Sequence, residues 1–261
     1  MNQPLLDELL GALAAGEVEL VDLTQPLSER TPVMRVPEPF VNTQGLRVRE
    51  ISRYDERGAR WYWNHLELGE HVGTHLDAPV HWYTGRGRED VASVPLRRLV
   101  GPAVVIECAE QAAADPDYLL TLDELREFEK EHGALPEGGW LLMRTGWDAR
   151  VHDPALFLNN ASGRPRTPGI AADCARYLAQ ETGIVGVGVE TVGTDAGASP
   201  AFDPPTPVHH YMLGAGKCGV TSLTNLDLLP VRGAMVVVAP LRLVGGSGSP
   251  ARVMAFVPRG T

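Results

Sequence analysis

Cysteine is scarce in this chain, and its three cysteines form no recognisable motif. Cys108, Cys174 and Cys218 are odd in number, far apart in the sequence and free of any CxxC pair. This pattern argues against a disulfide framework and against a thiolate metal site. We therefore expect reduced, mostly buried thiols and a cytoplasmic protein.

Positive charge and long apolar segments are also lacking. The formal net charge is -10 and the sequence pI is about 5.3, whereas a nucleic-acid-binding protein normally carries a basic surface. No apolar run reaches the roughly 18 residues that a membrane span requires, and no basic leader of a signal peptide precedes the first apolar residues. We expect a soluble protein that acts on a small molecule, with no nucleic-acid or membrane partner.

What the chain does contain is typical of a globular α/β domain. Hydrophobic residues make up 44% and charged residues 21%, close to the averages for soluble proteins. The 28 glycines and 21 prolines indicate many turns and extended connections rather than a helical bundle. Strand-like runs alternate with a few amphipathic helices and no linker divides the chain, which predicts one mixed α/β domain.

The clearest helix is expected at 121–133, where Thr121 and Glu124 form a capping box and Gly133 ends the pattern. Other helices are expected at 4–15, 171–183 and, in short form, 208–216. Residues 1–17 would form a helical arm able to pack on a neighbour, and 18–261 the domain itself. Strands are expected at 18–27, 46–52, 60–68, 102–109, 140–146, 184–191, 218–226, 234–243 and 253–258.

The segment HVGTHLDAPVH, residues 71–81, contains three of the chain's eight histidines together with an aspartate. Imidazole nitrogen and carboxylate oxygen suit zinc and manganese. His71 and His75 are four residues apart, and one helical turn would point both side chains at one place. His71, His75 and Asp77 are therefore candidate metal ligands. A purely structural site is the less favoured interpretation, because structural zinc sites usually include cysteines.

Three protein ligands would leave coordination positions for water and substrate. A bound divalent cation lowers the pKa of its water from 15.7 to about 7, so that hydroxide is available at neutral pH. His81 follows Asp77 by four residues, with Pro79 between them. We hypothesise that His81 does not bind the metal and instead accepts and then donates the proton.

This segment resembles the HxGTHxDxPxH signature of the metal-dependent cyclase-type amidohydrolases, which include kynurenine formamidase and isatin hydrolase. Three further stretches are similar to motifs of that family: VDLTQPLSERTP (21–32), GVGVETVGTD (186–195) and VHHYMLGAGKCGVTSLTNLDLL (208–229). The resemblance thus extends from about Val21 to Leu229.

The resemblance implies a swivelling β/β/α fold, a mixed sheet layered with helices, assembled into a homodimer or homotetramer. It implies that His71, His75 and Asp77 hold Zn²⁺ or Mn²⁺ and that His81 transfers the proton. The reaction would be hydrolysis, through a metal-bound hydroxide, of the amide-like C–N bond of an aryl amide or a cyclic amide.

The chain departs from the family pattern at several positions. A family glutamate that bridges two metals corresponds to Thr221, and the family histidine twelve residues before it corresponds to His209. Glu190 stands where the Gly-rich strand has an aspartate. We therefore expect one metal per subunit, with these three residues as additional ligands or as neighbours of ligands. The N-terminal loop has VMRVPEPF (33–40) in place of W-P-G-D, which argues against kynurenine formamidase activity.

Two tryptophans are candidates for lining an aromatic substrate pocket: Trp63, for which core packing is an equal alternative, and Trp82, which follows His81 directly. Two other functions stay open. The protein could be a cyclase or dehydratase for a polyketide-like intermediate, or a metal-containing binding protein without catalysis. The presence of His81 favours catalysis, because simple binding does not require a proton-transfer group.

Overall fold

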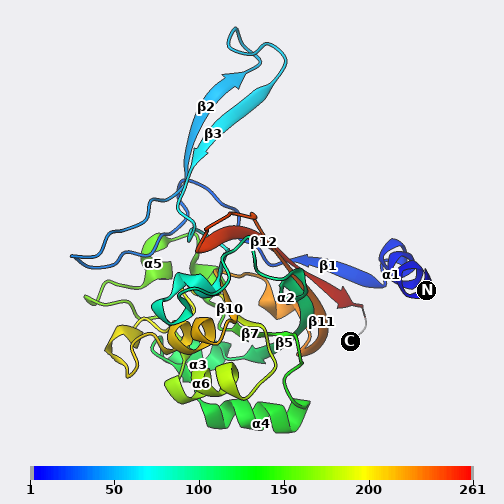
Figure 1. Cartoon of the computed structure of the whole chain (residues 1–261), viewed down its shortest axis with the longest axis vertical. Coiled ribbons are helices and arrows are strands. Elements are labelled where there is room, and N and C mark those ends of the chain that lie inside the picture. Colours follow the sequence, from blue (N-terminus) through cyan, green and yellow to red (C-terminus); the bar gives the residue numbers. More distant parts are fainter. Residues whose placement is uncertain (1–2, 260–261) are drawn as a thin grey trace.

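The computed structural model describes residues 3–259, and its centre is an eight-stranded mixed sheet that closes on itself (Figure 1). The strand order is β1-β12-β11-β5-β7-β9-β10-β4, and β4 also pairs with β12. The four strands β5, β7, β9 and β10 run parallel to one another. The strands are β1 (Val18–Asp22), β4 (His75–Asp77), β5 (Val100–Glu107), β7 (Trp140–Arg144), β9 (Gly186–Val189), β10 (Cys218–Thr221), β11 (Arg232–Pro240) and β12 (Gly248–Pro258).

Apolar side chains are buried on both faces of this sheet, as strand β7 shows. Trp140 and Leu142 belong to a cluster enclosed by the curved sheet, whereas Leu141 and Met143 pack beneath the helices. The α-helices are α1 (Gln3–Ala15), α2 (Leu96–Leu99), α3 (Ala109–Ala114), α4 (Leu122–His132), α5 (Pro154–Leu158) and α6 (Ala172–Gln180). Among the residues described, no helix has both the length and the apolar character needed to cross a membrane.

Short elements complete the connections. A π-helix covers His209–Leu213, and the two-stranded pair β6 (Leu119–Leu120) and β8 (Gly169–Ile170) runs parallel. Single 3₁₀ turns occur at Pro79–His81, Tyr83–Gly85, Trp147–Arg150, Ser199–Ala201 and Leu226–Leu228.

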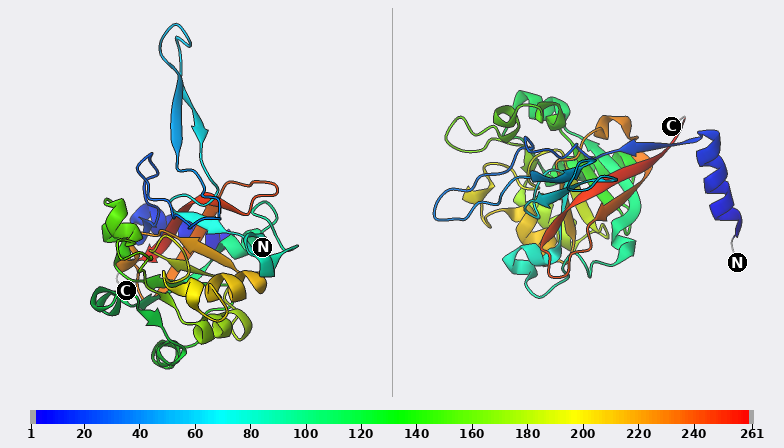
Figure 2. Two further views of the ribbon diagram at one scale, coloured as in Figure 1. Left: turned by 90° about the vertical axis from the view of Figure 1, so that its left-hand side faces the viewer. Right: turned by 90° about the horizontal axis from the view of Figure 1, so that it is seen from above.

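Two elements project from the body. The antiparallel hairpin β2 (Arg47–Arg53) and β3 (Tyr62–Glu67) extends far from the sheet (Figure 1). Helix α1 stands apart from the rest of the chain at the far end of β1 (Figure 2). The placement of α1 agrees with the expected helix at 4–15, while the domain boundary at residue 17 stays a prediction.

The structure confirms the predicted mixed α/β fold and shows in addition that the sheet is closed and barrel-like. It also confirms the capping box: Thr121 Oγ1 accepts from the Glu124 backbone N–H, and the Glu124 side chain accepts from the Thr121 N–H. The predicted helical turn between His71 and His75 is wrong. Gly73, with φ of +64°, turns the chain, and residues 75–77 then pair as a strand with β10 and β12. Pairing on both sides favours the extended backbone over a helix.

The capping box gives a stability prediction. Thr121→Ala removes the side-chain acceptor of an otherwise unpaired helix N–H, and we expect a loss of about 1 kcal/mol of unfolding free energy. For a chain of this size this corresponds to a fall in Tm of about 2–4 °C, measurable by circular dichroism. Glu131→Ala, at an exposed position late in the same helix, is the control and should leave Tm nearly unchanged; an equal fall in both variants would contradict the assignment.

Candidate metal centre

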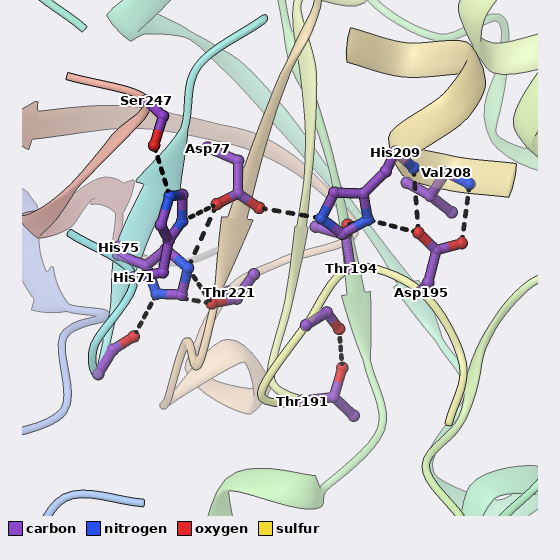
Figure 3. Close-up of polar contacts among 12 residues, drawn as sticks. His71, His75, Asp77, Thr191, Thr194, Asp195, Val208, His209, Thr221 and Ser247 are labelled. Atoms are coloured by element: carbon purple, nitrogen blue, oxygen red, sulfur yellow. Dashed lines mark hydrogen bonds and ion pairs between the residues drawn. The ribbon is translucent and has the colours of Figure 1, made fainter. Parts of the chain in front are cut away.

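Strand β4 brings the candidate ligands into the closed sheet. In the pairing of β4 with β10, His75 lies opposite Thr221 and Asp77 lies opposite Gly219. Both β4 side chains are buried, with exposed fractions of 5% for His75 and 2% for Asp77. Gly219 is required here, because a Cβ would lie 3.3 Å from Asp77 Oδ2 and 2.8 Å from a methyl group of Thr194. The close-up shows Asp77 between His71 and His75 on one side and His209 on the other (Figure 3).

The shortest hydrogen bond of His75 assigns its proton to one ring nitrogen. Its Nδ1 lies 2.7 Å from the carbonyl oxygen of Gly73, which can only accept, so Nδ1 carries the proton. Nε2 is then the nitrogen with the lone pair, and it lies 3.3 Å from Asp77 Oδ1. A histidine whose other nitrogen is bonded to a carbonyl oxygen is the usual arrangement for a metal ligand.

His209 is oriented in the same way by a carboxylate. Its Nδ1 lies 2.5 Å from Asp195 Oδ2, and Asp195 also accepts from the backbone N–H groups of Val208 and His209. The other ring nitrogen, Nε2, lies 3.8 Å from Asp77 Oδ2. Burial disfavours the charged imidazolium, but the carboxylates of Asp195 and Asp77 outweigh it and raise the pKa of His209. The surroundings therefore favour positive charge at this point.

The arrangement around Asp77 fits a divalent cation. Lone pairs of imidazole nitrogens converge on the oxygens of a buried carboxylate, and acceptors that face one another need a positive charge between them. Burial disfavours the anion, yet the nearby His75 and His71 hold the pKa of Asp77 well below its usual range. The centre thus combines imidazole nitrogens with one ionised carboxylate, a set of donor types that suits zinc or manganese.

His81 lies beside this group. Its ring is 4.0 Å from the His71 ring and 5.6 Å from the His209 ring, measured between centroids. Burial lowers the pKa of His81 to about 4, with Asp77 acting in the opposite direction, so the imidazole is neutral at pH 7.

The distances allow two choices for the third ligand. Potential ligand atoms of His71, Asp77 and His81 all lie within 4.8 Å of one another, which would make His81 a ligand in place of His75. We favour His75 because its Nδ1 proton is fixed by Gly73, whereas no side-chain hydrogen bond holds the His81 ring among residues 3–259. A neutral and unrestrained imidazole is better suited to proton transfer.

The three additional candidates have different surroundings. His209 joins the cluster, as described. Thr221 Oγ1 lies 3.1 Å from His75 Nδ1 and 3.5 Å from His75 Nε2, so Thr221 contacts a candidate ligand. Glu190 is not brought to the cluster: one carboxylate oxygen accepts from the backbone N–H groups of Thr145 and Trp147 and from the Thr145 hydroxyl.

The two candidate tryptophans lie in different parts of the molecule. Trp82 lies at the centre, with its ring centroid 4.8 Å from that of His209 and 6.1 Å from that of His81, and its buried Nε1 has no hydrogen-bond partner among the described residues. Trp63 lies on the projecting hairpin with 54% of its surface exposed and contacts Trp61. Within one chain, therefore, Trp63 neither packs in the core nor lines this centre.

Sequence reasoning missed three polar residues next to the candidate ligands. Ser247 Oγ lies 2.9 Å from His71 Nε2 and 2.6 Å from Glu70 Oε2, although the stretch GGSGS (245–249) resembles only a flexible turn. Asp195 holds His209. In the sequence, Asp195 could have been found as the last residue of the motif at 186–195, whereas Ser247 and Glu70 carried no signal.

The fold and the site define a metal-dependent hydrolase, and comparison with known proteins agrees. Residues 21–196 match the family model described as putative cyclase. The isatin hydrolase of Roseibium aggregatum is 43% identical over 260 residues, 98% of each chain. A kynurenine formamidase of Salinibacter ruber is 28% identical over 90% of this chain and 96% of its own. The chain belongs to the cyclase family.

Solved structures support the same assignment. An isatin hydrolase bound to the product analogue thioisatinate superposes with a TM-score of 0.96 at 42% identity, covering 99% of this chain and all of that one. A predicted metal-dependent hydrolase from Bacillus stearothermophilus gives 0.66 at 26% identity, covering 92% of this chain and 98% of that one. The protein is a metal-dependent amidohydrolase that acts on C–N bonds.

The surroundings of Glu190 predict a dependence of stability on pH. Burial, aided by Asp148, raises the pKa of Glu190 to about 7, despite three hydrogen bonds that oppose the shift. Because the folded-state pKa exceeds the unfolded value, the stability that the protonated group contributes is present below about pH 4.5 and is lost as the pH rises through about 7. The glutamine side chain of a Glu190→Gln variant is neutral at every pH, so this variant should not show the loss of stability above pH 4.5.

The test is thermal unfolding of both proteins between pH 4.5 and pH 8. We expect the Tm of the Glu190→Gln variant, relative to that of the natural protein, to rise steadily over this interval and level off above pH 7. A difference in Tm that is constant with pH would show that Glu190 titrates as an ordinary carboxylate.

Proposed function

We propose that this protein hydrolyses the amide bond of a cyclic aryl amide of the isatin type, using one Zn²⁺ or Mn²⁺ per chain. The observation that carries the proposal is the convergence of three imidazole nitrogens on the buried carboxylate of Asp77. The similarity to isatin hydrolases over nearly the whole chain supports the substrate class.

In this proposal His71, His75 and Asp77 hold the metal, with His209 as a further nitrogen donor at a longer distance from Asp77. When bound, the cation polarises the amide carbonyl and lowers the pKa of water. Thr221 in place of a bridging glutamate supports a single metal, because a hydroxyl is a much poorer ligand for a divalent cation than a carboxylate.

His81 transfers the proton. Its neutral ring accepts a proton from the attacking water, and the resulting imidazolium donates it to the nitrogen of the breaking C–N bond. Because the amide is cyclic, the product is one ring-opened molecule that carries an arylamine and a carboxylic acid. His81 returns to its neutral form, and the acid loses its proton to solvent. A lowered pKa makes the imidazolium a stronger acid, which helps the amide nitrogen to depart, and makes the neutral ring a weaker base toward the attacking water.

Trp82 supplies the aromatic wall of the substrate site. Its ring lies against His209, and a flat aryl substrate can stack on such a surface.

The test combines metal analysis with turnover of isatin and formanilide. We expect about one zinc or manganese per chain in the natural protein. His75→Ala should lose both metal and turnover. His81→Ala should keep the metal and lose a factor on the order of 10²–10⁴ in kcat.

The outcomes separate the alternatives. Natural protein without stoichiometric metal would refute the proposal. Loss of metal in His81→Ala would make His81 a ligand rather than the proton carrier. Bound metal without hydrolysis of any amide would favour a cyclase or a binding protein.

We also propose that the protein is a homo-oligomer and works in the cytoplasm. The free thiols of its three cysteines, all buried, are consistent with a reducing compartment. A two-stranded hairpin is only marginally stable in water by itself, yet β2 and β3 project alone. The β2–β3 hairpin exposes several large apolar or aromatic side chains that suit contact with a second copy of the chain: Val48, Ile51, Tyr54, Trp61, Tyr62, Trp63 and Leu66.

Light scattering coupled to gel filtration tests the oligomer. We expect a dimer or tetramer for the natural chain, and a shift toward monomer for the double variant Trp63→Ser with Leu66→Ser, because both remove apolar surface from the contact. Leu96→Ser, at a position 80% exposed on the body, is the control. A monomeric natural chain, or an oligomer that the double variant leaves intact, would contradict the proposal.

A further inference from the structure

Ser247 connects a candidate metal ligand to a carboxylate. It lies in the turn before β12, and its hydroxyl is 2.6 Å from Glu70 Oε2 and 2.9 Å from His71 Nε2 (Figure 3 shows the contact with His71). Its backbone N–H also donates to the same Glu70 oxygen, at 3.0 Å. The turn itself is fixed, because the N–H of Ala78, next to Asp77, donates to the Ser247 carbonyl at 2.9 Å.

Counting protons assigns the role of each atom. The Glu70 carboxylate can only accept, so the single hydroxyl proton of Ser247 is directed to Glu70. Ser247 Oγ must then accept from His71, which places a proton on His71 Nε2. The remaining nitrogen, Nδ1, lies 2.8 Å from Asp77 Oδ1. At this distance Nδ1 needs a positive partner shared with the carboxylate, either a second proton or a metal ion.

Gly248 leaves the space that the His71 ring occupies. A Cβ at this position would lie 2.4 Å from His71 Cε1 and 2.8 Å from Nδ1, so only glycine lets the ring pack against the strand. Gly248 also pairs with Asp77 in the β12–β4 ladder. The Ser-Gly pair therefore sets both the position of the ring and the nitrogen that faces Asp77.

We propose that Glu70 and Ser247 are positioning residues that hold His71 with Nδ1 as its metal-binding nitrogen and thereby set the metal affinity. His75, in contrast, presents Nε2, because its Nδ1 is bonded to Gly73. The two histidines thus use opposite nitrogens, and each choice is fixed by a neighbour. This inference rests on the metal centre of the proposed function.

The experiment measures metal affinity in metal-free protein, by competition between the protein and a chromophoric chelator for Zn²⁺ and for Mn²⁺. Ser247→Ala removes the acceptor for His71 Nε2–H, and Glu70→Gln supplies an amide donor that lets the serine proton turn toward His71. We expect each variant to weaken binding by about 10–100-fold, the usual effect of losing an outer partner of a ligand histidine. Ser247→Thr keeps the hydroxyl and should bind like the natural protein.

Ser249→Ala is the matched control. Ser249 is buried two residues further on, in β12, and among the described residues its hydroxyl bonds to backbone atoms of Leu241 and Pro250, so its loss should lower Tm without changing metal affinity. A Ser247→Ala variant that binds as tightly as the natural protein would refute the inference. Equal weakening in Ser247→Ala and Ser249→Ala would refute it too, since the effect would then come from general destabilisation.

A second readout is independent of affinity. In the zinc-loaded protein, long-range ¹H–¹⁵N spectra should show His71 protonated at Nε2 and the metal at Nδ1, with the reverse assignment for His75. Failure of the natural protein to bind either metal would refute the proposed function itself, whereas metal bound through His71 Nε2 would refute only the positioning role of Ser247.

Discussion

The pairing of β4 with two other strands is the constraint on which the site depends. Only three residues long, β4 is bonded to β10 on one side and to the start of β12 on the other. This double pairing closes the sheet. It also brings three segments that are distant in the sequence to one place: the histidine motif, the π-helix with His209, and the turn with Ser247. Without this closure, Asp77 would lack its burial between these segments.

Features that depend on local sequence could be predicted, and those that depend on distant pairing could not. The capping box at Thr121 and the buried run of β5 reflect neighbouring residues, so both were visible in the sequence. The conformation of residues 71–77 was not, because a spacing of four residues fits a helix as well as a turn followed by a strand. The choice is made by β10 and β12, more than 140 residues away.

The difference between local sequence and distant pairing also explains which residues of the candidate site could be predicted. The motif named His71, His75, Asp77 and His81, and the structure brings all four together, although their individual roles stay predictions. Asp195 and Ser247 act through hydrogen bonds to His209 and His71, and such partners are selected by the fold rather than by spacing. Glu190 shows the reverse error: it fills a motif position, yet its carboxylate is used by the backbone of Thr145 and Trp147.

Charge balance links these outer residues to the chemistry. In the proposed centre, Asp77 is the one anionic ligand, because Thr221 replaces a carboxylate and Glu190 points elsewhere. A divalent cation held by neutral imidazoles and a single carboxylate would keep a net positive charge, and this charge would favour ionisation of water and polarisation of a carbonyl. Asp195 and Glu70 are carboxylates too, but each acts through one intervening group, a histidine ring or a serine hydroxyl. They can therefore orient the ligands firmly while neutralising the metal less than direct ligands would.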